Sequence, residues 1–207
     1  MLVVLTGGAR SGKSRAAVEI ATNTAMPVVF VATAEPLDDD MVSRIELHRA
    51  ERPSNWETIE ATRDLPSAMS SVDCNVTVVI DCLTLWIATL ISDDPLKPTD
   101  AVIDETATLI SDDPLKLADA ITDEVGLLLE QLKARDGVTV VVTNEVGSGV
   151  VPATALGRAY RDLLGLVNQT LVTAADMAYL VVAGRLLLLR QAASALTLRA
   201  NMPSTGG

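Results

Sequence analysis

The stretch that decides the fold is residues 7–14, which read GGARSGKS and fit the pattern G-x-x-x-x-G-K-[ST] of a phosphate-binding loop. An apolar run precedes the loop (LVVL, residues 2–5), and a segment with the character of a helix follows it (residues 15–22). In this order the glycines let successive backbone N–H groups face phosphate oxygens, and the start of the helix adds partial positive charge. A chance glycine-rich turn would seldom have both flanks, so the pattern predicts a nucleoside triphosphate site.

Two side chains of this loop have predicted roles of their own. Lys13 is expected to reach the β- and γ-phosphates, and the hydroxyl of Ser14 is expected to ligate Mg²⁺. The residues expected to bind the nucleotide through the loop are Gly7, Gly8, Ala9, Arg10, Ser11, Gly12, Lys13 and Ser14.

Composition indicates a single globular domain. The chain has 207 residues, of which 49% are hydrophobic and 2% aromatic, so aliphatic side chains must form the core. We assign residues 1–190 to this domain and residues 191–207 to a mobile C-terminal tail. The net charge of −11 argues against a nucleic-acid or anionic-membrane surface.

Other features bear on location and on the cysteines. A core strand is expected almost at the first residue, with no secretory signal before it, so a cytoplasmic protein is expected. The most apolar region, residues 163–189, is interrupted by polar and charged residues, which predicts a helix followed by buried strands and no membrane span. Cys74 and Cys82 lack metal-ligand spacing and are expected to be buried free thiols.

Apolar runs rich in valine and isoleucine alternate with segments of helical length, at residues 2–5, 28–32, 76–80, 138–143 and 178–182. Continuous apolar strands of this kind predict an α/β fold, in which a mostly parallel sheet carries helices on both faces. In such a sheet the nucleotide lies at the carboxyl ends of the strands.

One segment is duplicated in tandem. Residues 89–107 read TLISDDPLKPTDAVIDETA, and residues 108–126 read TLISDDPLKLADAITDEVG. We interpret the nineteen-residue duplication, residues 89–126, as a lengthened, solvated helical connection in which Ser-Asp-Asp-Pro marks the start of a helix. A metal site formed by its aspartates is the less favoured alternative.

A basic stripe is predicted on the helix expected at about residues 41–51. Arg44, His48 and Arg52 are spaced by four residues and therefore fall on one face. Arginines suit triphosphate oxygens, and a neutral imidazole is a competent nucleophile at physiological pH. His48 is the only histidine of the chain and is therefore a candidate nucleophile; an ordinary surface histidine is the alternative.

Polar residues follow the third and fourth of these apolar runs, residues 76–80 and 138–143. Asp81 closes the run 76–80 and is the expected Mg²⁺ ligand, directly or through water. A carboxylate after an apolar run is a weak signal by itself, but it gains weight beside a phosphate-binding loop. The segment 143–152 (TNEVGSGVVP) is either a substrate-binding loop or a simple turn, and the residues alone do not decide between them.

Several motifs, in this order, make the sequence resemble a known enzyme family. GGARSGKSR, VATAEPLDDDM, RIELHRAERPSNW, DCLTLW and VVVTNEVGSGVVP are similar to motifs of the bifunctional adenosylcobinamide kinase/adenosylcobinamide-phosphate guanylyltransferase of cobalamin biosynthesis. The resemblance spans residues 1 to about 184 and implies a P-loop NTPase with a RecA-like sheet. It also implies a homo-oligomer, with a trimer as the form expected from the family.

The resemblance implies two reactions. ATP or GTP phosphorylates the aminopropanol hydroxyl of adenosylcobinamide, and GMP from GTP then passes through a guanylylated histidine to the new phosphate, giving adenosyl-GDP-cobinamide. On the matching motif that histidine is His48, and the other residues implied in catalysis are Lys13 and Asp81. Beyond the loop, the residues implied to contact the nucleotide are Ala32, Thr33, Ala34, Arg49, Ala50, Glu51, Arg52, Glu60 and Asp81.

Two departures from the family pattern concern assembly more than nucleotide chemistry: the duplicated segment 89–126 and the extended chain after Gly184.

Two other functions stay open. One is a phosphate-loop kinase for another small metabolite, in which His48 has no role. The other is a GTP-binding module without turnover.

Overall fold

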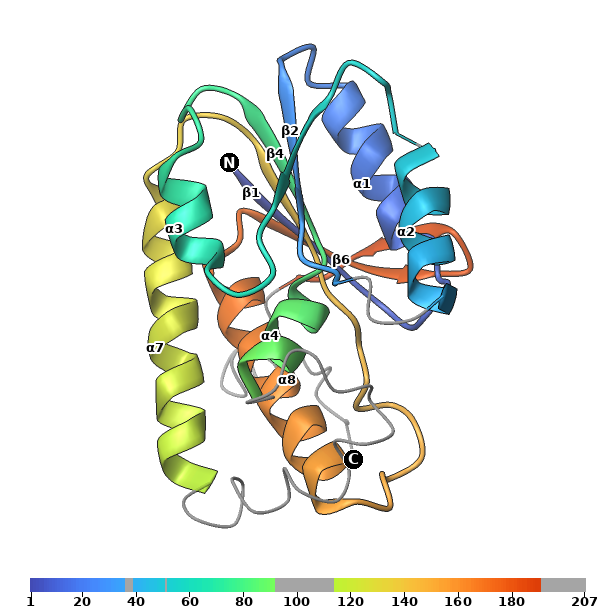
Figure 1. Cartoon of the computed structure of the whole chain (residues 1–207), viewed down its shortest axis with the longest axis vertical. Coiled ribbons are helices and arrows are strands. Elements are labelled where there is room, and N and C mark those ends of the chain that lie inside the picture. The colour runs from blue at the N-terminus through green and yellow to red at the C-terminus, as the bar shows by residue number, and fades with distance from the viewer. Residues whose placement is uncertain (36–38, 51, 92–113, 191–207) are drawn as a thin grey trace, which may run out of the picture.

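The computed structural model describes residues 1–35, 39–50, 52–91 and 114–190. Its described strands form a seven-stranded sheet in the order β3-β2-β4-β5-β1-β6-β7 (Figure 1). Every neighbouring pair is parallel except β6 and β7, which are antiparallel. The strands are β1 (Leu2–Thr6), β2 (Val28–Ala32), β3 (Glu57–Glu60), β4 (Thr77–Asp81), β5 (Thr139–Val142), β6 (Met177–Val182) and β7 (Arg185–Leu188). The predicted α/β P-loop fold is confirmed.

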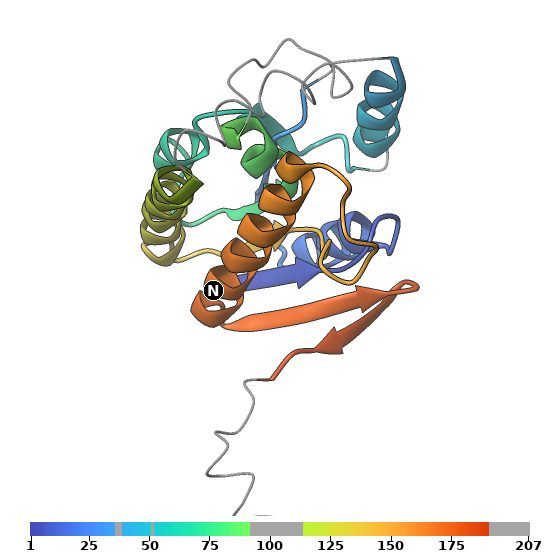
Figure 2. The same ribbon diagram turned by 90° about the horizontal axis from the view of Figure 1, so that it is seen from below.

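Helices cover both faces of the sheet (Figures 1 and 2). They are α1 (Lys13–Thr22), α2 (Asp39–Ala50), α3 (Leu65–Ser70), α4 (Leu83–Ile91), α7 (Pro114–Lys133) and α8 (Ala155–Ala174). Helix α1 packs on β1, β4 and β5 from one side, whereas α4 and α8 contact the sheet from the other side and α7 packs against α3 and α8.

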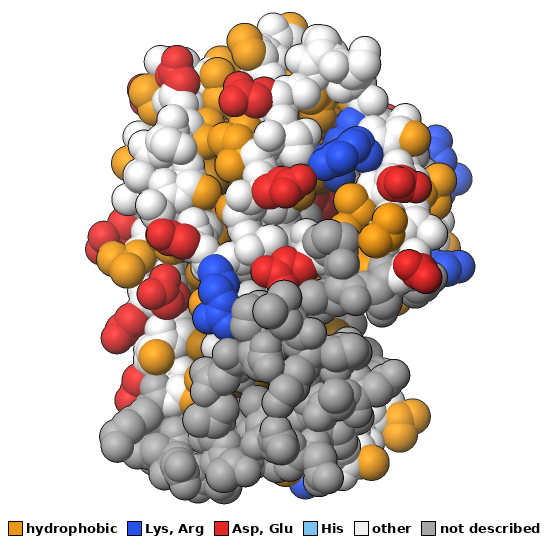
Figure 3. Space-filling model, viewed as in Figure 1, with side chains coloured by type: hydrophobic (Ala, Val, Ile, Leu, Met, Phe, Trp, Pro, Cys, Tyr) orange, Lys and Arg blue, Asp and Glu red, His pale blue; other side chains and the backbone are white. Residues whose placement is uncertain are grey.

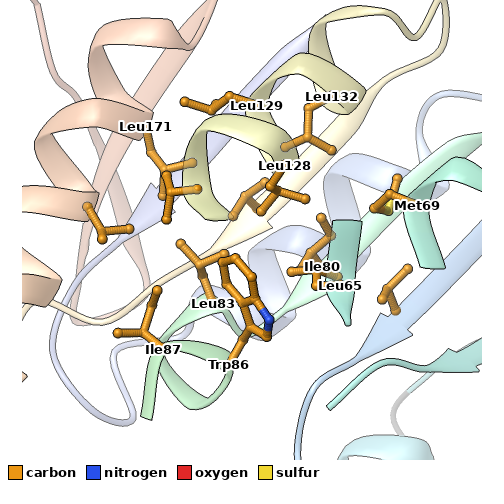
Figure 4. Close-up of a cluster of buried hydrophobic side chains, with 14 of the residues drawn as sticks. Leu65, Met69, Ile80, Leu83, Trp86, Ile87, Leu128, Leu129, Leu132 and Leu171 are labelled. Atoms are coloured by element: carbon orange, nitrogen blue, oxygen red, sulfur yellow. The ribbon is translucent and has the colours of Figure 1, made fainter. Parts of the chain in front are cut away.

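The two layers have separate hydrophobic clusters because successive strand residues point to opposite faces. In β4, Val78 and Ile80 belong to the cluster with α3, α4, α7 and α8, and Val79 belongs to the cluster with α1. Trp86, fully buried, lies in the larger cluster beside Leu83 and Leu128 (Figure 4), and its indole N–H donates to the backbone oxygen of Arg63 at 2.7 Å. Aliphatic packing around one satisfied tryptophan forms this core, in agreement with the composition.

The duplicated segment is described only in part. Residues 92–113 lie outside the described residues and contain most of the aspartates weighed for a metal site, whereas Asp119 and Asp123 lie on α7 (Pro114–Lys133). The end of the second copy forms the start of α7, which begins at Pro114. Proline in the first turn agrees with the predicted helix start.

Two expectations about burial are wrong. The strands predicted after α8 were expected to be buried, but Leu186, Leu187 and Leu188 on β7 are 41–55% exposed because β7 is the edge strand. Cys74 and Cys82 are free, but Cys74 is exposed, since it lies in the turn before β4. Burial raises the pKa of the Cys82 thiol to about 11, so it stays protonated at neutral pH.

Candidate active site

The phosphate-binding loop leaves β1 and enters α1 without a side-chain cap. Gly12 stands at the N-cap of α1 with a φ of 101°, and no side chain accepts a hydrogen bond from the first turn. The first N–H groups of a helix have no partner within the helix, so this end of α1 offers donors to an anion. Arg10 also has a positive φ, 54°, which shows how sharply the loop turns.

Lys13 lies folded against the loop. Its Nζ donates to the carbonyl oxygens of Gly7 and Gly8, at 2.9 and 2.8 Å, and burial lowers its pKa, with Cys82 and Asp81 opposing that shift. The hydroxyl of Ser11 is buried without a hydrogen-bond partner among the described residues. The loop therefore holds a cation and a buried hydroxyl where phosphate oxygens are expected.

Neighbouring strands fix the loop. The N–H of Gly184, in the turn between β6 and β7, donates to the oxygen of Ser11 at 2.8 Å. The N–H of Glu145, after β5, donates to the oxygen of Gly7 at 3.0 Å. A Cβ at Gly7 would collide with the carbonyl oxygen of Val181. The loop conformation thus depends on contacts with the sheet as well as on its own glycines.

A cavity of about 360 Å³ opens beside the loop. The side chains that line it come from α1, β2, β4, the end of α2 and the segment after α2: Ser14, Arg15, Val18, Phe30, His48, Arg52 and Asp81. The fold therefore gathers the predicted metal ligands, the only histidine and an arginine of the predicted stripe. The side chain of Arg44, the other arginine of that stripe, lies outside the described part of the structure.

Asp81 ends β4 on the cavity wall. Burial raises its pKa, while a hydrogen bond from Ser14 and the charges of His48, Arg52 and Lys13 lower it. A hydroxyl and a carboxylate in contact form a hard oxygen donor set, which fits Mg²⁺. Among the described residues, no group of three or more His, Cys, Asp and Glu side chains could hold a metal ion, so any ion here would complete its coordination with phosphate and water.

Arg52 provides a second cation in the cavity. Burial lowers its pKa, the carboxylate of Asp81 opposes this shift and the charge of Arg49 adds to it. Its Nη1 is buried and makes no hydrogen bond within the described structure. Since a buried guanidinium nitrogen normally has a partner, this atom is suited to an anionic ligand.

Other residues implied by the resemblance do not line the cavity. Arg49 and Glu60 pair with each other at 3.1 Å, with exposed fractions of 59% and 71%. Thr33 is fully buried and its hydroxyl is occupied, because it donates to the oxygen of Cys82 at 2.6 Å and accepts from the Cys82 N–H at 2.9 Å. Ala32 and Ala34 flank Thr33 at the end of β2, Ala50 ends α2 on the surface, and Glu51 lies outside the described residues.

Sequence reasoning missed the apolar wall of the cavity, formed by Val18 and Phe30. Phe30 is the only phenylalanine of the chain and precedes Ala32 by two residues, so strand alternation could have placed it on the same face. Val18 follows Ser14 by four residues on α1, which puts the two side chains on one helical face.

The loop, the strand order and the cavity define a P-loop nucleotide-binding protein. The family described as cobinamide kinase / cobinamide phosphate guanyltransferase matches residues 3–189, and the chain belongs to this family. The bifunctional adenosylcobalamin biosynthesis protein CobU of Escherichia coli (strain K12) is 38% identical over 190 residues, 89% of this chain and 97% of that protein.

Two further relatives have similar names. CobU of Salmonella typhimurium (strain LT2) is 36% identical over 89% of this chain and 97% of its own length. The bifunctional adenosylcobalamin biosynthesis protein CobP of Pseudomonas aeruginosa is 35% identical over 87% of this chain and 92% of its own. Among solved structures, the RadB recombinase covers 86% of this chain and 73% of its own at a TM-score of 0.43 and 15% identity, too distant a likeness to bear on function.

Proposed function

We propose that this protein is a bifunctional enzyme of cobalamin biosynthesis. It phosphorylates the aminopropanol hydroxyl of adenosylcobinamide with ATP or GTP, and it then transfers GMP from GTP, through guanylylated His48, to adenosylcobinamide phosphate. The product is adenosyl-GDP-cobinamide. The observation that carries the proposal is that His48 lines the same cavity as Ser14 and Asp81, in a chain of this family.

The residues of the cavity have distinct tasks in this mechanism. The loop N–H groups and Lys13 bind the β- and γ-phosphates, and Ser14 and Asp81 are the residues that would hold Mg²⁺, which neutralises phosphate charge. The imidazole of His48 attacks the α-phosphorus of GTP, so a P–N bond forms and pyrophosphate leaves with the electrons of the broken P–O bond. An oxygen of adenosylcobinamide phosphate then attacks the same phosphorus and releases the imidazole.

Arg52 supports the transfer electrostatically. Its guanidinium lies in the same wall as His48 and can neutralise the charge that builds up on the phosphoryl oxygens. Some GTP contacts are proposed only because the residues match the family motif: Ala32, Ala34, Arg49, Ala50, Glu51 and Glu60.

The remaining features of the proposal concern assembly and surroundings. We propose a homo-oligomer, with a trimer as the expected form, and the exposed leucines of β7 are a surface that such an assembly could cover. Figure 3 shows acidic side chains scattered over its described surface among uncharged ones, and together with the net charge of −11 they argue against a nucleic-acid partner. None of the described helices has the length and apolarity of a bilayer span. We place the enzyme in the cytoplasm, with residues 1–190 as its single domain.

Label transfer tests the proposal. The protein is incubated with Mg²⁺ and GTP labelled at the α-phosphate, and wild type is compared with His48→Asn and with Glu46→Gln, an exposed change on the same helix. We expect acid-labile, alkali-stable label on wild type and on the control, and none on His48→Asn. A folded wild type that takes up no label would exclude His48 as the nucleophile.

The same variants separate the rival functions. If His48→Asn keeps phosphoryl transfer to adenosylcobinamide while losing label, the two half-reactions are distinct steps at this site. A wild type that phosphorylates another metabolite but not adenosylcobinamide would be a different phosphate-loop kinase. One that binds GTP without releasing phosphate or pyrophosphate would be a binding module.

A further inference from the structure

Thr33 is a buried polar residue that has no task in the mechanism so far. It directly follows β2 and is fully buried. It matches a family motif for GTP contacts, yet its side chain does not line the cavity. The hydroxyl of a buried threonine normally has a hydrogen-bond partner within the protein, so its partners indicate what Thr33 does.

Both partners of this hydroxyl are backbone groups of Cys82. Thr33 Oγ1 donates to the Cys82 carbonyl oxygen at 2.6 Å and accepts from the Cys82 N–H at 2.9 Å. The backbone N–H of Thr33 also donates to the carbonyl oxygen of Asp81, at 3.4 Å. Because a hydroxyl can donate and accept at the same time, this one side chain satisfies both polar backbone groups of Cys82.

Cys82 is the single residue that links β4 to α4. Strand β4 ends at Asp81, and α4 begins at Leu83. The parallel ladder between β2 and β4 ends with the pair Ala32 and Asp81. Thr33 therefore holds the chain at the first residue beyond the ladder. Since the side chain of Asp81 leaves the backbone just before this point, a shift of Cys82 would turn the carboxylate relative to the cavity.

The direction of the Asp81 carboxylate matters for the predicted cation site. This carboxylate accepts a hydrogen bond from Ser14, which lies on α1, and the two residues line one cavity. Their oxygens come from segments far apart in the chain, so the pair keeps its geometry only if the end of β4 is fixed. Threonine suits this task, because its branched side chain is stiff at χ1 and fixes the direction of the hydroxyl.

We propose that Thr33 is a positioning residue of the cation site. By holding the backbone of Cys82, its hydroxyl fixes the Asp81 carboxylate opposite Ser14 and so sets how strongly Mg²⁺ promotes nucleotide binding. Partners that hold a metal ligand in place in this way commonly determine metal affinity. The proposal rests on the proposed function in that a nucleotide and Mg²⁺ bind at the loop.

Nucleotide binding measured with and without Mg²⁺ tests this without corrinoid or turnover. Calorimetric titrations of the full chain with the β,γ-imido analogue of GTP give one affinity in Mg²⁺ and one in EDTA. The ratio of the two affinities is the Mg²⁺ increment. The variants are Thr33→Val, which lacks the hydroxyl at nearly equal volume, and Thr33→Ser, which keeps it.

Thr77→Val is the matched control. Thr77 is as fully buried as Thr33, but it lies at the opposite end of β4, and its hydroxyl pairs with that of Thr24 at 2.8 Å. Both valine variants should lower the unfolding midpoint, because each loses a buried hydrogen bond. Only Thr33→Val should lose the Mg²⁺ increment, so the comparison separates positioning from stability.

We expect Thr33→Val to lose about tenfold of the Mg²⁺ increment, with its affinity in EDTA unchanged. Thr33→Ser should keep most of the increment. Asp81→Asn should lose the increment too, and adding Thr33→Val to it should cause no further loss, since the carboxylate to be positioned is gone. If Thr33→Val does not fold, Thr33→Ala, which also lacks the hydroxyl but is smaller, gives the same comparison.

The other outcomes are distinct. A full increment in the variants without the hydroxyl, alongside a loss in Asp81→Asn, would overturn the positioning role and leave the proposed cation site intact. An equal loss of affinity in EDTA would also overturn it, because the effect would then not involve the cation. A wild type that gains no affinity from Mg²⁺ would overturn the cation site, and this proposal with it.

Discussion

The guanidinium carbon of Arg52 lies 3.4 Å from the centre of the Phe30 ring. Phe30 is buried in β2, and its ring forms part of the cavity wall together with His48 and Asp81. The stack thus fixes a planar cation beside a histidine and a carboxylate, which have to be close to a phosphate for the proposed transfer. A cation held over an aromatic face needs less reordering when an anion binds.

Arg52→Lys should therefore weaken nucleotide binding. Lysine keeps the charge but loses the planar stack and the forked donors, so we expect the affinity for Mg²⁺-GTP to fall about tenfold. Calorimetric titration measures this, with Arg161→Lys as the control, since Arg161 pairs with Asp162 on α8 at 2.8 Å and does not line the cavity. Equal losses in the two variants would contradict a specific role for the stack.

Asp81→Asn should stabilise the nucleotide-free protein while removing phosphoryl transfer. Burial raises the pKa of Asp81 above its ordinary value of 3.8, so the folded protein keeps this proton to a higher pH than the unfolded chain. The ionised carboxylate therefore reduces the free energy of unfolding at neutral pH, and this cost disappears as the pH falls through the raised pKa towards 3.8.

Urea unfolding at pH 7 and pH 4 checks this expectation. Asp81→Asn should be more stable than wild type at pH 7, with a smaller difference at pH 4, and Mg²⁺-GTP should stabilise it less than wild type. We expect its phosphoryl transfer to fall by on the order of 100-fold. A nucleotide-free variant less stable than wild type at pH 7 would show that the carboxylate stabilises the fold.

Gly7→Ala and Gly8→Ala form a matched pair within the loop. A Cβ at Gly7 would collide with the backbone oxygen of Val181, and Gly7 has a φ of 153°; a Cβ at Gly8 would meet nothing within 4 Å. We expect Gly7→Ala to lower the free energy of unfolding by about 2 kcal/mol and Gly8→Ala to change it by less than about 0.5 kcal/mol. Thermal unfolding distinguishes them, and similar midpoints for both variants would argue against the close approach to β6.

The parts that could be predicted from the sequence are those with local causes. The loop pattern, the apolar runs and Pro114 each restrict the backbone near themselves, so the central strands and α1, α2 and α8 could be expected from them. The edge strands β3 and β7 could not, because ETIE and RLLL lack a buried face and depend on pairing with β2 and β6. The exposure of Cys74 was missed for a related reason: the burial of a small apolar residue in a turn depends on what packs over it.

The sequence by itself determined which residues were candidates for the chemistry: a loop for phosphates, a lone histidine and a carboxylate at the end of a strand. Only the tertiary structure decided which of them meet. The parallel pairing of Ala32 with Asp81 brings the ends of β2 and β4 together, and α1 then closes the cavity with Ser14 and Val18. The insertion of β5 between β4 and β1 puts Asn144 beside Gly7. These contacts join residues far apart in the chain, and strand order follows from the packing of the whole sheet and not from any local pattern.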